Sequence, residues 1–135
     1  MLSHDVDLGL RLEVASNPAC PAATLRQLSD EPGAVSLVVA GNPGSPAELL
    51  EMLGCDLDMR VRAEVAHNPS SPLVILRRMY RHEGAEVRLG VAANPACPAD
   101  LLVRMLQDED RSVAAVAAVH PRLPDHLRAM WQLAH

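Results

Sequence analysis

The 135-residue chain carries a formal net charge of −5 and contains no Phe, one Tyr and one Trp. The length suffices for one domain with a buried core, but the lack of aromatic bulk excludes a large globular interior and favours thin stacked layers of Val, Ala, Leu and Met. Three scattered cysteines exclude a disulfide framework, and no apolar run approaches the roughly 18 residues of a membrane span. Residues 1–8 are too short and too acidic for a signal peptide, so we expect a soluble cytoplasmic protein.

A five-residue unit recurs along the chain. It reads Asn17-Pro18-Ala19-Cys20-Pro21, Asn42-Pro43-Gly44-Ser45-Pro46, Asn68-Pro69-Ser70-Ser71-Pro72, Asn94-Pro95-Ala96-Cys97-Pro98 and, in a divergent fifth copy, His120-Pro121-Arg122-Leu123-Pro124. The steps between successive copies are 25, 26, 26 and 26 residues. A fixed period in this range indicates a solenoid of stacked repeats.

Each unit predicts a corner between two helices. A proline disfavours the α conformation of the residue before it, so a helix ends at the Asn, whose side chain satisfies nearby backbone groups. The second proline follows Ser45 or Ser71, and Ser-Pro is typical of a helix start with the hydroxyl as N-cap and the proline at the first helical position. Cys20 and Cys97 take the place of the serines, so we expect small structural residues there rather than reactive thiols.

Apolar residues at helical spacing flank every corner. Before it stand Leu10, Val35, Val61, Val87 and Val113, and four residues later Val14, Val39, Val65, Val91 and Ala117. After it stand Leu25, Leu50, Leu76 and Leu102, and three residues later Leu28, Leu53, Met79, Met105 and, in the last copy, Trp131. We predict two short helices per repeat and a single domain over 1–135, with repeats at about 8–32, 33–58, 59–84, 85–110 and 111–135.

Two stretches, from Asp56 to Leu76 and from Glu86 to Leu102, closely resemble the leucine-rich repeat variant family, and the resemblance extends from about Leu8 to His135. Valine-arginine, valine-alanine, Asn-Pro-x-x-Pro and a leucine pair recur in register. The resemblance implies an all-α fold, a right-handed α-solenoid in which α-helices alternate with short α- or 3₁₀-helices. The strand motif of the ordinary leucine-rich horseshoe is absent.

Some members of that family carry an N-terminal iron–sulfur segment with clustered cysteines. Residues 1–8 of this chain contain no cysteine, and Cys20, Cys55 and Cys97 lie one or two repeats apart. At roughly 10 Å per helix layer they cannot share a cluster. We therefore expect no cofactor.

Two polar columns follow the repeat. Asn17, Asn42, Asn68 and Asn94, with His120 in the last copy, form either a ligand-binding ladder or, as we favour, a structural column that satisfies buried backbone groups. Arg11, Arg62 and Arg88 lie six residues before the Asn. They either bind an anionic partner or, as we favour, pair with the acidic links at Asp56, Asp58, Glu83 and Glu86.

The charge is unevenly distributed. Residues 1–59 carry nine acids and two arginines, whereas residues 60–88 carry six arginines and three acids. Arg77, Arg78 and Arg81, with Arg104 one repeat later, form the best candidate for a partner-binding patch. Arg78 and Arg104 hold the same repeat position, so we expect them to be neighbours on one surface. A solvated helix face is the alternative.

No catalytic or metal-binding motif is present, so we expect no enzyme activity. The favoured function is a non-catalytic scaffold for protein–protein interaction. One alternative is an accessory or regulatory domain of a redox system, inherited from the iron–sulfur members. The other is binding to a nucleic-acid backbone, as in some helical solenoids, although the net negative charge and the scarcity of aromatics oppose it.

The last repeat is apolar all round from Val113 to Val119, whereas a terminal repeat should present a polar outer face. Either His126, Arg128 and the C-terminal tail cover it, or a second chain does. The sequence thus suggests an end-to-end homodimer through Val116, Met130 and Trp131.

Overall fold

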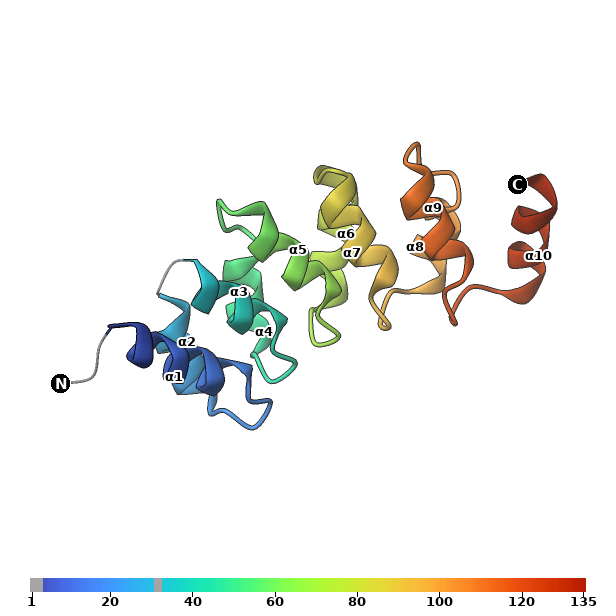
Figure 1. Ribbon diagram of the computed structural model, residues 1–135. Helices are drawn as coiled ribbons and strands as arrows, with labels where there is room; N and C mark the ends of the chain where they lie inside the picture. Colours follow the sequence, from blue (N-terminus) through green and yellow to red (C-terminus); the bar gives the residue numbers. More distant parts are fainter. Residues whose placement is uncertain (1–3, 31–32) are drawn as a thin grey trace.

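The computed structural model describes residues 4–30 and 33–135, so residues 1–3 and the link residues Glu31 and Pro32 lie outside it. The described residues form ten α-helices and no strand (Figure 1). Their bounds are α1 His4–Ser16, α2 Ala22–Ser29, α3 Ala34–Gly41, α4 Ala47–Leu53, α5 Met59–His67, α6 Leu73–His82, α7 Ala85–Ala93, α8 Ala99–Met105, α9 Arg111–Ala118 and α10 Asp125–Ala134.

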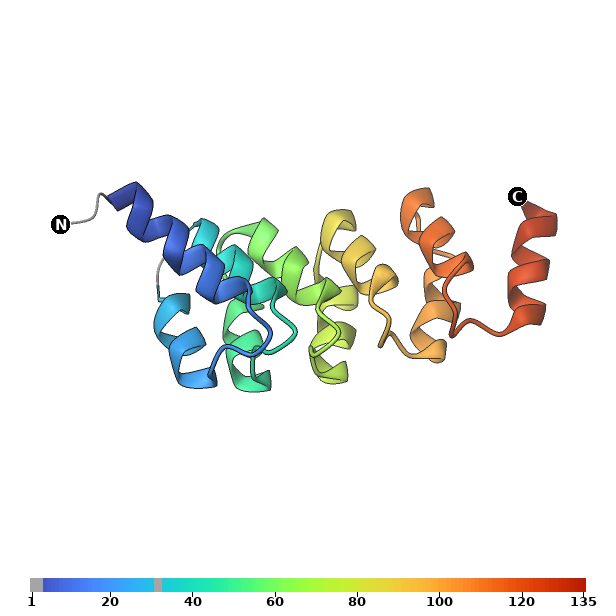
Figure 2. The ribbon, with the colours of Figure 1, turned by 60° about the horizontal axis from the view of Figure 1, so that its bottom comes forward.

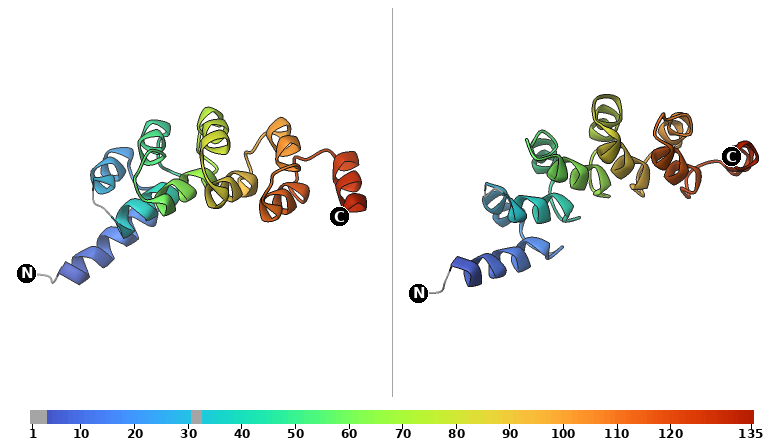
Figure 3. Two further views of the ribbon diagram at one scale, coloured as in Figure 1. Left: turned by 90° about the horizontal axis from the view of Figure 1, so that it is seen from above. Right: turned by 45° about the horizontal axis from the view of Figure 1, so that its top comes forward.

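The helices form two layers in an extended α-solenoid. Helices α1, α3, α5, α7 and α9 pack against one another in chain order and make one layer. Helices α2, α4, α6 and α8 form the second layer, which is separate when the molecule is seen from above (Figure 3, left). The two termini lie at opposite ends of the stack (Figure 2).

The core runs along the seam between the layers, as the apolar pattern predicts. It contains Val35, Val39, Val61, Val65, Val87, Val91 and Val113 from the first layer and Leu25, Leu50, Leu76, Met79, Leu102 and Met105 from the second. The first repeat departs from the prediction, because Leu10 and Val14 are 49% and 44% exposed. In the other repeats the second helix of the preceding repeat packs on the first helix and covers these two positions. Among the described residues, no helix precedes α1.

The second helices are α-helices, so the 3₁₀-helices that the resemblance allowed are not formed in the described residues. A trace of 3₁₀ geometry remains in their first turns. Leu49 N donates to Pro46 O, and Ile75 N donates to Pro72 O, both over 3.0 Å and three residues apart. The next N–H of each helix, from Leu50 or Leu76, donates to the same proline carbonyl in the α pattern.

The last helix is attached differently from the other second helices. Helix α10 contains no buried residue, and Trp131, a predicted core position, is only half-buried. In Figure 3 it lies beside α9 at the end of the stack, apart from the row of α2, α4, α6 and α8. Arg128 occupies the position at which the other second helices carry a core leucine.

Candidate partner-binding site

Asn42, Asn68 and Asn94 are buried and link each corner to the one before it. The side-chain amide of each donates to two carbonyls of the preceding repeat over 2.6–2.9 Å: those of the preceding Asn and of the Ala two residues before it. Each Oδ1 accepts the N–H two residues further on over 2.8–2.9 Å. Both amide hydrogens are thus used within the stack, so this column holds successive corners together.

The two ends of this column differ. His120 imitates the carboxamide: Nδ1 accepts the N–H of Arg122 over 3.0 Å, which leaves Nε2 to donate to Asn94 O over 2.7 Å. These roles assign the neutral tautomer with its hydrogen on Nε2. Asn17, at the other end, is exposed, and its Oδ1 accepts the N–H of Ala19 over 2.9 Å.

The serines of the corners close the preceding helix and do not start the next one, so the predicted N-cap role is wrong. Ser45 Oγ donates to Val39 O over 2.7 Å, and Ser71 Oγ donates to Val65 O over 2.6 Å. The N-cap residues are the prolines Pro46 and Pro72 themselves, without a side-chain cap. Each of these carbonyls also accepts the backbone N–H of the corner Asn over 3.1 Å, so the hydroxyl adds a second donor at the helix end.

Cysteine at the serine position is buried in the same way. Cys97 is fully buried, and burial raises the pKa of its thiol to about 12. A thiol with that pKa is protonated and inert near neutral pH. Cys20 is also buried, whereas Cys55, outside the corners, is exposed.

The arginine column pairs with acidic residues of the links. Arg62 Nε donates to Glu83 over 3.1 Å and its Nη1 donates to the carbonyl of Asp56 over 2.7 Å. Arg88 makes two bonds to Asp108, over 2.9 and 3.0 Å. Each pair joins the first helix of a repeat to the link at the end of that repeat, so these two guanidinium groups are engaged within the stack. Arg62 pairs with one of the predicted acids, whereas Arg88 pairs with Asp108, a link residue that was not among them.

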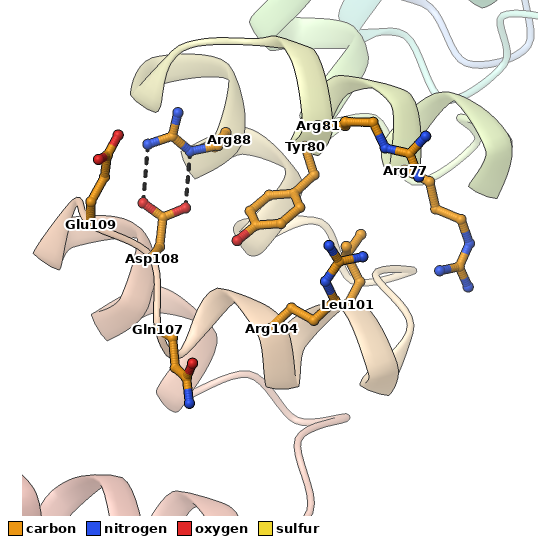
Figure 4. Close-up of a pocket in the computed structure, with 9 residues that line it drawn as sticks. All are labelled: Arg77, Tyr80, Arg81, Arg88, Leu101, Arg104, Gln107, Asp108 and Glu109. Atoms are coloured by element: carbon orange, nitrogen blue, oxygen red, sulfur yellow. Dashed lines mark hydrogen bonds and ion pairs between the residues drawn. The ribbon is translucent and has the colours of Figure 1, made fainter.

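The candidate arginines are divided between two neighbouring grooves. Arg77, Arg81 and Arg104 line an open groove of about 490 Å³ between α6 and α8, with Tyr80 and the Arg88–Asp108 pair (Figure 4). Arg78 lines the preceding groove, where its Nη2 lies 3.9 Å from the sulfur of Cys55. Arg78 and Arg104 are both exposed but line successive grooves, so their joint action in one partner-binding patch stays a prediction. A side chain at this position reaches back over the preceding repeat, so each enters a different groove.

The groove between α6 and α8 contains two arginines without acidic partners. Arg77 pairs with the exposed Asp100 over 2.7 Å, and Arg88 pairs with Asp108. In the described part of the chain, no ion pair or hydrogen bond engages the side chains of Arg81 and Arg104. Glu109 also borders the groove, so the excess of positive charge is confined to the side formed by these two arginines.

Repeat positions explain why this groove differs from its neighbour. Arg104 corresponds to Arg78, and Tyr80-Arg81 corresponds to Gly54-Cys55. Where the preceding groove has Cys55, this groove has a second arginine, Arg81, and both Arg81 and Arg104 line it. An anion bound in the groove would be attracted by both charges.

Tyr80 lies between the paired and the unpaired arginines, with its ring in the groove (Figure 4). Partial burial and the negative charge of Asp108 raise the pKa of its hydroxyl. The phenol is thus neutral near neutral pH and supplies a flat surface with one polar tip. The sequence analysis overlooked Tyr80, although no other repeat has an aromatic residue at this position.

The residues of the suggested C-terminal dimer differ in their exposure. Met130 is exposed, Val116 is half-buried, and the Trp131 ring stacks on His135 with centroids 4.4 Å apart. Arg128 donates to the carbonyls of Ala118 and His120, but His126 is exposed and so is Val119 of the apolar stretch, so the predicted covering by His126, Arg128 and the tail is observed only for Arg128. The homodimer stays a prediction.

Residues 8–30 and 33–135 contain no group of three His, Cys, Asp or Glu side chains arranged to hold a metal ion. None of the helices in the described ranges is both long and apolar enough to cross a membrane.

Comparison with known proteins identifies one repeat directly. The profile of the family described as "Leucine rich repeat variant" matches residues 85–110, which contain α7, the corner at Asn94 and α8. Searches of curated proteins and of solved structures returned no significant match. The resemblance seen in the sequence is confirmed for this unit, and the same helix–corner–helix arrangement recurs on both sides of it. Residues 85–110 thus match the leucine rich repeat variant family, and the described chain is an α-solenoid of helical repeats.

Proposed function

We propose that this chain is a non-catalytic repeat scaffold that binds a partner protein, and that an acidic segment of the partner occupies the groove between α6 and α8. The observation that carries the proposal is that Arg81 and Arg104 border one open groove and have no acidic partner among the described residues. Arg62, Arg77 and Arg88, by contrast, each form an ion pair with a carboxylate. Guanidinium groups form strong two-pronged bonds with carboxylates.

Carboxylate is the favoured anion because four other arginines of the stack already pair with one. Glu83 and Asp108 satisfy the arginines of successive grooves, and Glu48 and Asp100 satisfy Arg26 and Arg77 on the second helices. A partner carboxylate at Arg81 and Arg104 would repeat this pairing in trans. Tyr80 adds an apolar surface beside it, and aromatic and arginine side chains are enriched where interfaces gain most of their energy.

The test is binding of a fluorescein-labelled glutamate-rich peptide, followed by fluorescence anisotropy at low and at moderate salt. Arg81→Gln with Arg104→Gln should weaken binding at least tenfold. The matched control removes the same charge from two exposed arginines elsewhere, Arg111→Gln with Arg122→Gln, and should change affinity less than threefold.

Two further probes separate the alternatives. A peptide with glutamine in place of each glutamate should not bind, and duplex DNA should bind no better than this neutral peptide. Equal loss of affinity in both double variants would show that only net charge matters and would reject the groove. Tight binding of DNA that depends on Arg81 and Arg104 would favour the nucleic-acid function instead.

A further inference from the structure

A separate groove lies on the first layer, where α3 is flanked by α1 and α5. Its volume is about 300 Å³, and the residues that define it are Leu37, Val38 and Gly41 of α3, Pro43 of the following corner and Glu64 of α5. None of these residues borders the groove between α6 and α8.

The floor of this groove is apolar. Leu37 and Val38 are half-buried, and they lie on the side of α3 opposite Val35 and Val39, which are buried in the core. The groove therefore opens away from the second layer. Helix α3 supplies no charge to it, because Ala34–Gly41 contains no ionisable side chain.

Glu64 supplies a negative charge at the edge of this floor. Its Oε2 lies so close to α3 that a Cβ on Gly41 would be 2.8 Å from it, so the glycine leaves the space into which the carboxylate extends. Glu64 is exposed, and in the described part of the chain no ion pair or hydrogen bond engages its side chain. Arg60, one turn earlier on the same helix, pairs with Asp58 instead.

The repeat does not require an acid at this position. The equivalent residues of α3, α7 and α9 are Val38, Gly90 and Val116, although α1 has Glu13 there. The place is also unfavourable for a carboxylate, because Glu64 lies in the last turn of α5 and contacts the last turn of α3, and backbone carbonyls make both helix ends partially negative. These two turns contain no arginine and one histidine, so the negative potential is not balanced by an arginine there.

We propose that this groove is a second docking surface and that it binds a basic amphipathic segment of a partner protein. An arginine or lysine of the segment pairs with Glu64, and apolar residues beside it pack on Leu37 and Val38. Long cationic side chains fit such a place, because their apolar stems lie along apolar surface while the charged heads reach the acid.

Charge complementarity selects this occupant. An accessible carboxylate without a partner and two helix ends of the same sign attract a cation. Residues 1–59, which include α3, carry nine acids and two arginines, so the surrounding field has the same sign. The inference is independent of the groove between α6 and α8, which attracts the opposite charge.

The test is fluorescence anisotropy of a fluorescein-labelled peptide that alternates arginine and leucine, at low and at moderate salt. Glu64→Gln changes an exposed residue, should keep the circular dichroism of the wild type and should weaken binding at least fivefold. The matched control is Glu51→Gln, which removes the same charge from an exposed position of α4 in the other layer and should change affinity less than twofold. Arg81→Gln with Arg104→Gln should bind this peptide at least as tightly as the wild type.

Two altered peptides test the two halves of the contact. Citrulline, a neutral isostere, in place of each arginine should weaken binding at least tenfold, and serine in place of each leucine at least fivefold. Equal losses in Glu64→Gln and Glu51→Gln would show that only net charge matters and would overturn the proposal. Equal binding of the citrulline peptide would identify an apolar occupant instead of a basic one, and equal binding of the serine peptide would exclude the apolar floor. Absence of saturable binding to the wild type at millimolar peptide would reject the docking surface.

Discussion

At the scale of the residue, the corner requires one side chain to donate and accept at once. The carboxamide of Asn68 donates to two carbonyls of the preceding repeat and accepts an N–H of its own corner. A neutral imidazole can do the same with fewer donors, and His120 does so. A hydroxyl is too short and a carboxylate cannot donate, which explains why the column consists of these two residue types.

Asn68→Ala should destabilise the protein by about 3 kcal/mol, since three hydrogen bonds of about 1 kcal/mol each are lost and the carbonyls of Ala40 and Asn42 stay buried. Asn17→Ala is the matched control, because the same residue at the exposed end makes one bond; it should cost about 1 kcal/mol or less. Urea denaturation followed by circular dichroism measures both. Equal effects at the two positions would contradict the structural role of the column.

His120→Asn should be neutral or should stabilise the protein by up to about 1 kcal/mol. An Asn at this corner regains the second donor that imidazole lacks and can reach Ala92 O, the equivalent of Ala66 O, in addition to Asn94 O. The shift of the urea midpoint checks the sign. A clear loss of stability would mean that the imidazole ring itself packs in a way that Asn cannot replace, and His120→Ala serves as the unfavourable reference.

At the scale of the element, ion pairs lock the links to the helices. The Asp108 side chain is 3% exposed and bonds Arg88 through both oxygens. Burial alone would raise the pKa of Asp108, but the hydrogen bonds from Arg88 and from the N–H of Asp110 outweigh it and hold the pKa below its usual 3.8. The charged carboxylate thus favours the folded state.

Asp108→Asn should cost about 2 kcal/mol at neutral pH, because the largely buried Arg88 loses the carboxylate that bonds it twice. A carboxylate with a lowered folded pKa stabilises the fold above its unfolded value of 3.8, and this contribution disappears as the pH falls through the lower folded value. The stability gap between wild type and variant should therefore be constant above about pH 5 and shrink below about pH 4. The free energy of unfolding of both proteins, measured across that pH range, tests this expectation. A stability difference that stays constant down to pH 2 would show that ionisation of Asp108 does not contribute to stability.

Some features of the helices could be predicted from the sequence, and others could not. The period and the prolines were enough to predict helix ends and the buried face, because they act within one repeat. The exposure of Leu10 and Val14 was not predictable from the pattern, since burial there depends on a preceding layer. The serine hydroxyls were assigned to the wrong helix, and the contact of Arg78 with Cys55 was not predicted, for a related reason: a period gives positions along the chain and does not give the direction in which a side chain reaches.

At the scale of the whole molecule, each repeat contacts only its neighbours, so stability is a sum of local terms along the stack. Helices α5 and α7 are covered on both sides and have fully buried valines and alanines. Helix α1 has one covered side, and α10 contains no buried residue. The groove between α6 and α8, where we propose that the partner binds, therefore lies next to the best-supported part of the layer, which favours a preformed shape.

Hydrogen exchange should reveal how local stability differs between the centre and the ends of the stack. We expect the slowest amide exchange in α5 and α7 and the fastest in α10, with α1 in between, because a terminal helix opens without disrupting a second interface. Mass spectrometry of peptic fragments resolves the order, and Asn68→Ala, which loosens the contact between the second and third repeats, should speed exchange in α3 and α5 more than in α9. Uniform protection along the chain would instead mean that all repeats unfold as one unit, and the ends would then be as rigid as the centre.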